Sequence, residues 1–236
     1  MRIKLTLSYD GTEFFGSQIQ KATPKTVIGT LSSILQKLGI HSIPVASGRT
    51  DRGVHATAQV CHLDLPPFWS DIKKLKETLE RMLPPSIAIR RIEVVSDDFH
   101  ARYSAKRRIY RYIISTKKSS PFTSRYVTHL PDATFEKLRK KIGIFEGKHD
   151  FSYFQKTGSD VKTTTREIYK AFAYKHKSYI ILYFEANGFL RSQVRLMCGA
   201  LLKLKKEQIE EMLKKEKHYK IKPAPPQGLY LAKIKY

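Results

Sequence analysis

The stretch on which the fold assignment rests is a polar connection between two apolar segments, Ser47-Gly48-Arg49-Thr50-Asp51-Arg52-Gly53-Val54-His55-Ala56. Strand patterns flank it at 43–47 and 58–65, so it joins two strands. Its two glycines permit tight turns or positive φ angles on either side of Asp51. The neighbouring arginines favour the ionised form of the Asp51 carboxyl, by opposite charge and by hydrogen bonding.

Helix and strand patterns alternate outward from this connection. Ile3, Leu5, Leu7 and Tyr9 alternate with polar residues, as in a half-buried strand. Up to residue 95 we expect a strand at 3–9, a helix at 27–38, strands at 43–47 and 58–65, a helix at 72–82 and a strand at 87–95. This order, β-α-β-β-α-β, is that of the ferredoxin-like fold.

The second part of the chain repeats the order of elements without repeating the residues. We expect a strand at 109–114, a helix at 133–145, strands at 166–174 and 178–186, helical segments at 189–204 and 206–216, and a closing strand at 228–236. The prediction is an α+β protein with two ferredoxin-like halves, residues 1–100 with the Asp51 connection and residues 101–236. The halves would form a mixed sheet, with helices on one face and a central cleft on the other.

Charge indicates the binding partner. The 236 residues include 44 Lys and Arg against 21 Asp and Glu, which gives a formal net charge of +23. With 41% hydrophobic residues the chain is globular, which excludes a disordered basic tail. Because a globular domain of this charge repels itself, RNA or DNA is the expected partner. The central cleft is then expected to bind RNA.

Membrane and metal signals are lacking in the sequence. No segment reaches the ~20 apolar residues that span a bilayer, and the start of the chain has no apolar run typical of a signal peptide. Cys61 and Cys198 match no metal or redox spacing and are expected as buried thiols. We therefore expect a cytoplasmic protein without membrane association or a metal site.

Asp51 is the candidate reactive group. An ionised carboxylate repels the phosphates that a basic RNA-binding surface attracts, so its presence there suggests a chemical task. It could act as a nucleophile or a base towards a sugar or a nucleobase. The alternative is that Asp51 closes a turn while Arg49 and Arg52 bind phosphates.

Six blocks, in order, cover nearly the whole chain and resemble those of the TruA family of tRNA pseudouridine synthases. The 48–56 connection resembles the signature loop of that family, whose aspartate is essential. The other blocks are Tyr9-Asp10-Gly11-Thr12-Glu13-Phe14-Phe15-Gly16-Ser17-Gln18-Ile19-Gln20, Phe99-His100-Ala101-Arg102-Tyr103-Ser104-Ala105 with Tyr110-Arg111-Tyr112, His149-Asp150-Phe151-Ser152, the helix at 189–199, and Ala224-Pro225-Pro226-Gln227-Gly228-Leu229-Tyr230-Leu231.

The resemblance implies a pseudouridine synthase fold and a cofactor-free reaction. A homodimer would convert uridine to pseudouridine at nucleotides 38, 39 and 40 of the tRNA anticodon stem-loop. Asp51 would attack either the ribose C1′ or the uracil ring. Tyr110 matches the tyrosine that stacks on the target uracil, and Arg195 matches the arginine that pairs with the catalytic aspartate.

Contacts with the RNA are expected from the residues around these groups. Arg49 would lie beside the extruded nucleotide or bind its phosphate, and His55 would contact RNA or serve the loop structurally. Basic residues that follow the first half would bind backbone phosphates. The expected RNA-binding residues are Arg49, Thr50, Arg52, His55, Arg107 and Arg108.

Two residues depart from the family pattern, and three other functions compete. Ser17 stands where tryptophan is common, and Gln193 where methionine is frequent. The same isomerisation could act on other RNA positions. A non-catalytic RNA-binding protein would have the same charge but no need for Asp51, Tyr110 and Arg195 together. A metal-dependent nuclease would need clustered carboxylates and histidines, which the sequence lacks.

Overall fold

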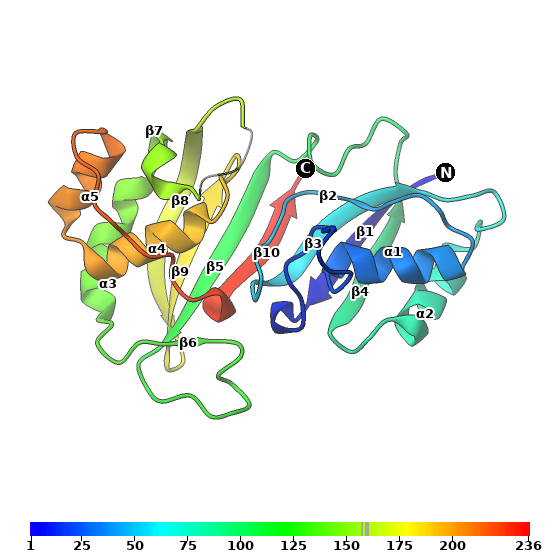
Figure 1. The fold of residues 1–236 in the computed structure, drawn as a ribbon, viewed down its shortest axis with the longest axis horizontal. Helices are drawn as coiled ribbons and strands as arrows, with labels where there is room; N and C mark the ends of the chain where they lie inside the picture. Colours follow the sequence, from blue (N-terminus) through cyan, green and yellow to red (C-terminus); the bar gives the residue numbers. More distant parts are fainter. Residues whose placement is uncertain (157, 159–160) are drawn as a thin grey trace. The chain divides into compact units, whose positions relative to one another are not determined.

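A computed structural model describes residues 1–156, 158 and 161–236 of the chain (Figure 1). The chain forms two compact units, Met1–Lys106 with Leu231–Tyr236, and Arg107–Tyr230. Whether residues 1–100 and 101–236 behave as separate domains stays a prediction. Among the helices of the described residues, none has the length and apolar character that a membrane crossing requires.

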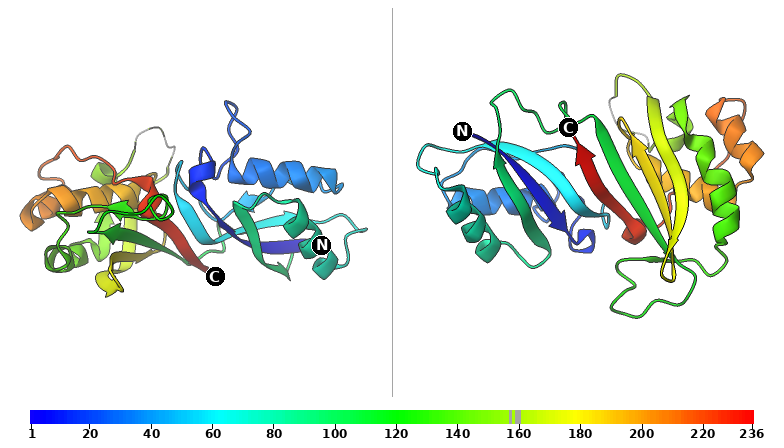
Figure 2. Two further views of the ribbon diagram at one scale, coloured as in Figure 1. Left: turned by 90° about the horizontal axis from the view of Figure 1, so that it is seen from below. Right: turned by 180° about the vertical axis from the view of Figure 1, so that it is seen from behind.

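The first unit has the predicted β-α-β-β-α-β order. Its elements are β1 (Arg2–Tyr9), the 3-10 turn η1 (Gly11–Glu13), α1 (Val27–Lys37), β2 (Val45–Ala46), β3 (His55–Asp64), α2 (Ile72–Met82) and β4 (Ile87–Val94). The strand order is β4-β1-β3-β10, and the short β2 also pairs with β3; β10 is the C-terminal strand (Leu229–Lys235). Both helices cover one face of these strands (Figures 1 and 2).

Alternation along β1 fixes which face of the first unit is buried. Ile3, Leu5 and Leu7 are completely buried, while the residues between them are partly exposed. β1 runs antiparallel to β3 and β4, so its apolar side chains lie in the middle of the layer under the helices. Thr26 and Asp71 accept hydrogen bonds from backbone N–H groups in the first turns of α1 and α2, which defines where each helix begins.

The second unit has the order β-α-β-β-α with additional short elements, and the strand that follows, β10, belongs to the first unit from Leu231 on. Its elements are β5 (Arg107–Ser115), β6 (Thr128–His129), α3 (Phe135–Ile142), η2 (Gly143–Phe145), β7 (Gly147–Asp150), η3 (Ser152–Phe154), β8 (Thr165–His176), β9 (Tyr179–Ala186), α4 (Gln193–Lys203), α5 (Lys206–Leu213) and η4 (Pro226–Gly228). The strand order is β5-β9-β8-β7, each pair antiparallel, and β6 adds a parallel pair at β5. The α+β prediction is therefore confirmed, and the mixture of pair directions with it.

Several boundaries differ from the sequence patterns, and for two of them the structure shows the reason. β3 begins at His55, earlier than the predicted 58, because Ala56 already pairs with Tyr9 of β1. α4 begins at Gln193 and not at 189, because Ser192 has a left-handed conformation with φ 58°. Cys61 and Cys198 are buried as predicted, and burial raises the pKa of both thiols.

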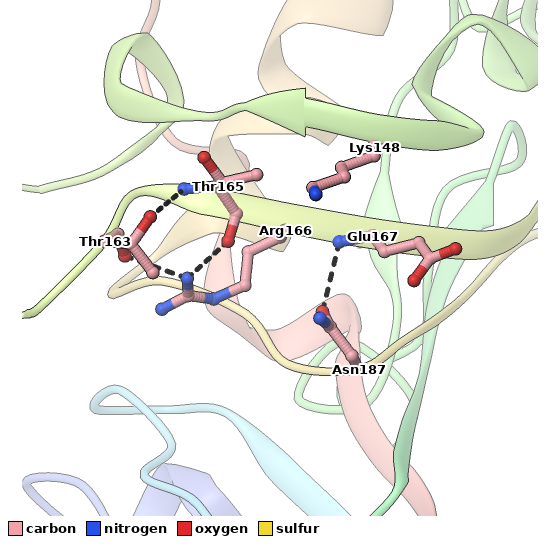
Figure 3. A pocket seen from close by; sticks show the side chains of 6 residues that line it. All are labelled: Lys148, Thr163, Thr165, Arg166, Glu167 and Asn187. Carbon is pink, nitrogen blue, oxygen red and sulfur yellow. Dashed lines mark hydrogen bonds between the residues drawn. The ribbon is translucent and has the colours of Figure 1, made fainter.

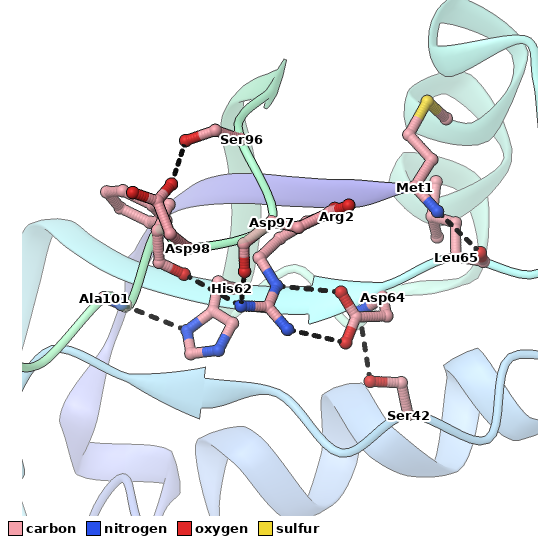
Figure 4. A network of polar contacts seen from close by, with 11 residues as sticks. Met1, Arg2, Ser42, His62, Asp64, Leu65, Ser96, Asp97, Asp98 and Ala101 are labelled. Carbon is pink, nitrogen blue, oxygen red and sulfur yellow. Dashed lines mark hydrogen bonds and ion pairs between the residues drawn. The ribbon is translucent and has the colours of Figure 1, made fainter.

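One arginine connects three segments of the first unit through its guanidinium. Arg2 on β1 forms a bidentate ion pair with Asp64 at the end of β3, at 2.8 and 3.0 Å (Figure 4). Its Nη1 also donates to the carbonyl oxygens of Asp97 and Phe99, in the segment after β4. This side chain thus connects three chain segments that are at least 30 residues apart in sequence.

Two glycines test how closely the second unit is packed. A Cβ added to Gly199 in α4 would lie 2.1 Å from the carbonyl oxygen of Lys222, whereas one added to Gly143 would meet nothing within 4 Å. Gly143 also has an ordinary helical conformation. We therefore expect Gly199→Ala to lower the free energy of unfolding by about 1–3 kcal/mol or more. Gly143→Ala should leave it unchanged or raise it by up to about 1 kcal/mol.

Urea unfolding of both variants, followed by circular dichroism, measures the difference. Equal midpoints for Gly199→Ala and the wild-type protein would show that the α4 backbone can move away from Lys222 at no cost.

Candidate active site

Asp51 lies in the turn that connects β2 to β3. The carbonyl oxygen of Asp51 accepts a hydrogen bond from the N–H of Val54 at 3.1 Å. Gly53 has a φ of 77°, which a residue with a side chain rarely adopts. Gly48 has no positive φ and no neighbour within 4 Å of an added Cβ. Of the two glycines predicted to shape the turn, only Gly53 adopts a backbone conformation that favours glycine.

Thr50, next to Asp51, is held on both of its backbone groups by Ser17. The Thr50 N–H donates to Ser17 Oγ at 2.8 Å, and the Ser17 N–H donates to the Thr50 carbonyl at 3.1 Å. Ser17 is only 1% exposed. The Thr50 and Tyr9 hydroxyls share a hydrogen bond of 2.9 Å, and burial raises the pKa of Tyr9 to about 12, so its phenol stays neutral. The residue before Asp51 is therefore anchored by buried groups.

The other side of the turn packs against η1. A Cβ on Gly11 would lie 2.0 Å from the carbonyl oxygen of Val54, so only glycine allows this approach. Gly53 N–H donates to the Gly11 carbonyl at 3.2 Å. The N–H of Gly11 donates to Nδ1 of His55 at 3.1 Å. The His55 ring is 1% exposed and lies 3.3 Å from Asp10 Oδ1. These contacts favour the structural alternative for His55.

A buried glutamine, which the sequence analysis missed, holds the start of the connection. Gln59 on β3 is completely buried. Its Oε1 accepts from the Ser47 hydroxyl at 2.7 Å, and its Nε2 donates to the Gly48 carbonyl at 2.8 Å. The available signal was a glutamine directly before the apolar residues Val60 and Cys61 of the strand.

The two arginines that flank Asp51 are exposed, unlike the residues that hold the turn. The Arg52 guanidinium lies over the ring of Phe15, 4.4 Å from its centroid. Such a contact orients a cation without neutralising it. Arg49 and Arg52 thus place positive charge at the surface on both sides of a partly exposed carboxylate.

In the second unit, β5 carries the predicted tyrosine and the two predicted arginines. Tyr110 is largely buried and makes an edge-to-face contact with Phe189, with ring centroids 5.2 Å apart. Arg107 forms an ion pair of 3.0 Å with Glu185, which is 2% exposed, and its guanidinium lies 4.5 Å from the centre of the Tyr169 ring. Arg108 donates to the carbonyl oxygen of Asn187 at 2.7 Å.

Arg195 projects from the first turns of α4. Its Nε donates to the carbonyl oxygen of Ala224 at 2.8 Å, and the N–H of Ala224 donates back to the Arg195 carbonyl at 2.8 Å. Gln193, the second departure from the family pattern, is 1% exposed and accepts from the Leu190 N–H through Oε1 at 2.7 Å. The glutamine therefore stabilises the entry into α4 through a hydrogen bond that methionine could not make.

The predicted residues fall into two groups. The first unit brings together Arg49, Thr50, Asp51, Arg52 and His55 in one turn. The second unit holds Arg107, Arg108 and Tyr110 on β5 and Arg195 on α4. Within the part of the chain that the structure describes, no group of three or more His, Cys, Asp or Glu side chains is arranged to hold a metal ion.

Comparisons with known proteins identify the family of the chain. The profile of a family described as tRNA pseudouridine synthase matches residues 6–104 and 142–236. The protein named tRNA pseudouridine synthase A from Wolinella succinogenes is 43% identical over 235 residues, covering 98% of this chain and 92% of that protein. A protein of the same name from Campylobacter jejuni is 41% identical over 241 residues, covering 100% of both chains.

A third relative has a somewhat lower identity. The tRNA pseudouridine synthase A of Limosilactobacillus reuteri is 37% identical over 249 residues, which covers 100% of this chain and 96% of that protein. Identity of this extent over full-length chains, together with the matching family profile, leaves one assignment: the chain belongs to the TruA family of tRNA pseudouridine synthases and is an isomerase.

Proposed function

We propose that this enzyme converts uridine to pseudouridine at nucleotides 38, 39 and 40 in the anticodon stem-loop of tRNA, with Asp51 as the nucleophile and without a cofactor. The reaction breaks the N1–C1′ glycosidic bond, turns the uracil and joins C5 to C1′. A base that is paired in the stem must first be flipped out of the helix. The enzyme therefore needs a fixed reactive group and a surface that binds the RNA backbone.

The observation that carries the proposal is the anchoring of the turn around Asp51. The N–H and the carbonyl oxygen of Thr50 are both hydrogen-bonded to Ser17, and the Gly53 N–H is hydrogen-bonded to the Gly11 carbonyl oxygen. A nucleophile gains from such positioning, because less freedom is lost when the reaction begins. The exposed Arg49 and Arg52 place positive charge on both sides of this residue, where a polyanionic RNA would approach.

The remaining roles follow from the family resemblance. We assign Tyr110 to stacking on the target uracil and Arg195 to keeping the reacting carboxylate charged in the working enzyme. Arg49, Arg52, Arg107 and Arg108 are assigned to RNA contacts. For Thr50 and His55, burial and hydrogen bonding support a role in holding the turn over direct RNA binding.

Replacing the nucleophile should stop the reaction and spare RNA binding. We expect Asp51→Asn to lower the rate of pseudouridine formation by at least about 10³-fold, because the amide cannot attack. Tight binding of tRNA should remain. The measurement is carbodiimide labelling and primer extension on unmodified tRNA, with binding followed by filter retention.

Stops at nucleotides 38 to 40 that disappear in Asp51→Asn support both the specificity and the nucleophile. Modification at other positions would replace the proposed specificity by the first alternative. Wild-type binding without isomerisation of any tRNA would favour the non-catalytic RNA-binding alternative.

The bond from Ser17 to Thr50 should affect the chemical step. We expect Ser17→Ala to lower kcat about 10-fold, since one buried hydrogen bond of about 1–1.5 kcal/mol is lost beside the nucleophile. KM for tRNA should stay within about 2-fold, because no RNA contact is removed.

Ser32 offers a matched control for this variant. Its buried hydroxyl has no hydrogen-bond partner among the residues that the structure describes. Ser32→Ala should leave kcat and KM at wild-type values. A kcat for Ser17→Ala equal to that of Ser32→Ala would show that the turn keeps its geometry without the Ser17 hydroxyl.

We also propose that the enzyme works as a homodimer in the cytoplasm. The support is the resemblance to the TruA family. Sedimentation equilibrium should give twice the chain mass of 27.3 kDa at micromolar concentration. A mass of one chain over the whole concentration range would contradict the dimer.

A further inference from the structure

A polar pocket in the second unit lies beside the residues assigned above. It has a volume of about 450 Å³ and is placed where β8 begins, next to β7 and the end of β9 (Figure 3). Its lining residues are Lys148, Thr163, Thr165, Arg166, Glu167 and Asn187. Lys148 and Asn187 approach it from β7 and from the residue after β9, so the pocket joins three parts of the unit.

Arg166 is held in place through part of its guanidinium. Nη1 donates to the carbonyl oxygens of Thr163 and Thr165 at 2.9 and 2.6 Å. A guanidinium has five N–H donors, so these bonds leave donors on Nε and Nη2. Among the described residues, no carboxylate lies within ion-pair distance of Arg166. The side chain is therefore fixed and remains a net positive charge.

Positive charge accumulates at the pocket. Arg108 donates to the carbonyl oxygen of the pocket residue Asn187, and burial together with this neighbouring guanidinium lowers the pKa of Arg166. Lys148 contributes a third cation against the single carboxylate of Glu167. An anion bound here would relieve the repulsion between the arginines.

The hydrogen-bonding groups favour a phosphate over other anions or a neutral ligand. Asn187 Oδ1 accepts from the Glu167 N–H at 3.1 Å, which leaves the Asn187 NH₂ group as a donor. With the guanidinium, the ammonium and two threonine hydroxyls, the lining offers many donors. Arginine forks match the paired oxygens of a phosphodiester.

The chain segment that begins at the pocket residue Asn187 leads to the surroundings of Tyr110. Asn187 is two residues from Phe189, whose ring contacts Tyr110. The carbonyl of Asn187 accepts from Arg108, and a Cβ on Gly188 would lie 3.6 Å from Arg166 Nε. A phosphate held by Arg166 would thus place a nucleotide next to the segment that carries Phe189.

We propose that this pocket binds one backbone phosphate of the tRNA substrate, through Arg166 and Lys148. The identity of the RNA rests on the proposed function, whereas the phosphate chemistry rests on the pocket alone. Sequence patterns did not indicate it, because neither residue belongs to the basic segments that were singled out.

The double variant Lys148→Gln/Arg166→Gln tests the assignment in the full chain. The dissociation constant for unmodified tRNA is measured between 50 and 200 mM KCl. The log–log salt slope should fall by about 1 relative to wild type, because one phosphate contact is lost. KM should rise about 10-fold or more, and kcat at saturating tRNA should change less than about 3-fold.

The control removes the same charge outside the pocket. Lys170→Gln/Lys177→Gln neutralises two cations of the same unit, at an exposed position of β8 and in the turn that follows it. It should keep the wild-type slope to within about 0.3. If the Arg166 change impairs folding, as a thermal melt would show, Lys148→Gln alone should still lower the slope, since its exposed side chain forms no bond within the described structure.

Each outcome decides one question. A double-variant slope and KM equal to those of the charge-matched control overturn the pocket assignment, even when wild type isomerises tRNA normally. A reduced slope in a protein that never isomerises tRNA upholds the pocket and rejects the proposed function. Inorganic phosphate that binds the wild-type protein at millimolar concentration without weakening tRNA binding at constant ionic strength, and that does not bind the double variant, overturns the phosphodiester in favour of a free phosphate ion.

Discussion

The close contact between η1 and the end of the Asp51 turn is the constraint on which the candidate site depends. Gly11 lies so near the Val54 carbonyl that any side chain would collide with it. At this distance Gly11 forms two hydrogen bonds with the turn. Its carbonyl oxygen accepts from the Gly53 N–H, and its own N–H donates to Nδ1 of His55. Since β1 leads directly into η1, the packing of β1 in the core sets the position of the turn.

Ser17 continues this arrangement on the other side of Asp51. The serine hydroxyl accepts a hydrogen bond from the Thr50 N–H, which the indole of a tryptophan, common at this position in the family, cannot do because its N–H only donates. Gln193 in the second unit is similar, because it replaces an apolar residue and satisfies a backbone N–H at the start of α4. In both places this chain uses buried hydrogen bonds where its family commonly uses apolar packing, and unsatisfied groups there would be costly.

The arginines near the candidate residues differ in exposure and in their partners between the two units. In the first unit, Arg49 and Arg52 are exposed beside Asp51. In the second, Arg107 is bound to the buried Glu185 and Arg108 to a backbone carbonyl. Arg166 remains with no carboxylate partner among the described residues, although it is fixed by two carbonyl oxygens. Fixed cations of this kind suit a polyanionic substrate, because little side-chain freedom is lost on binding.

The sequence by itself determined the order of helices and strands, the basic character and the family. Alternation at Ile3, Leu5 and Leu7 identifies a strand because its period is local, and the Asp51 connection is recognisable as a contiguous motif. Only the tertiary structure decided that Ser17 and Gln59 hold the turn through hydrogen bonds and that Lys148 and Arg166 line the same pocket. It also showed that Gly48 does not have a positive φ angle. Ser17 and Thr50 are 33 residues apart. Contacts of this range arise from how β1 and β3 are paired and packed, and no local periodicity records which buried polar groups will meet.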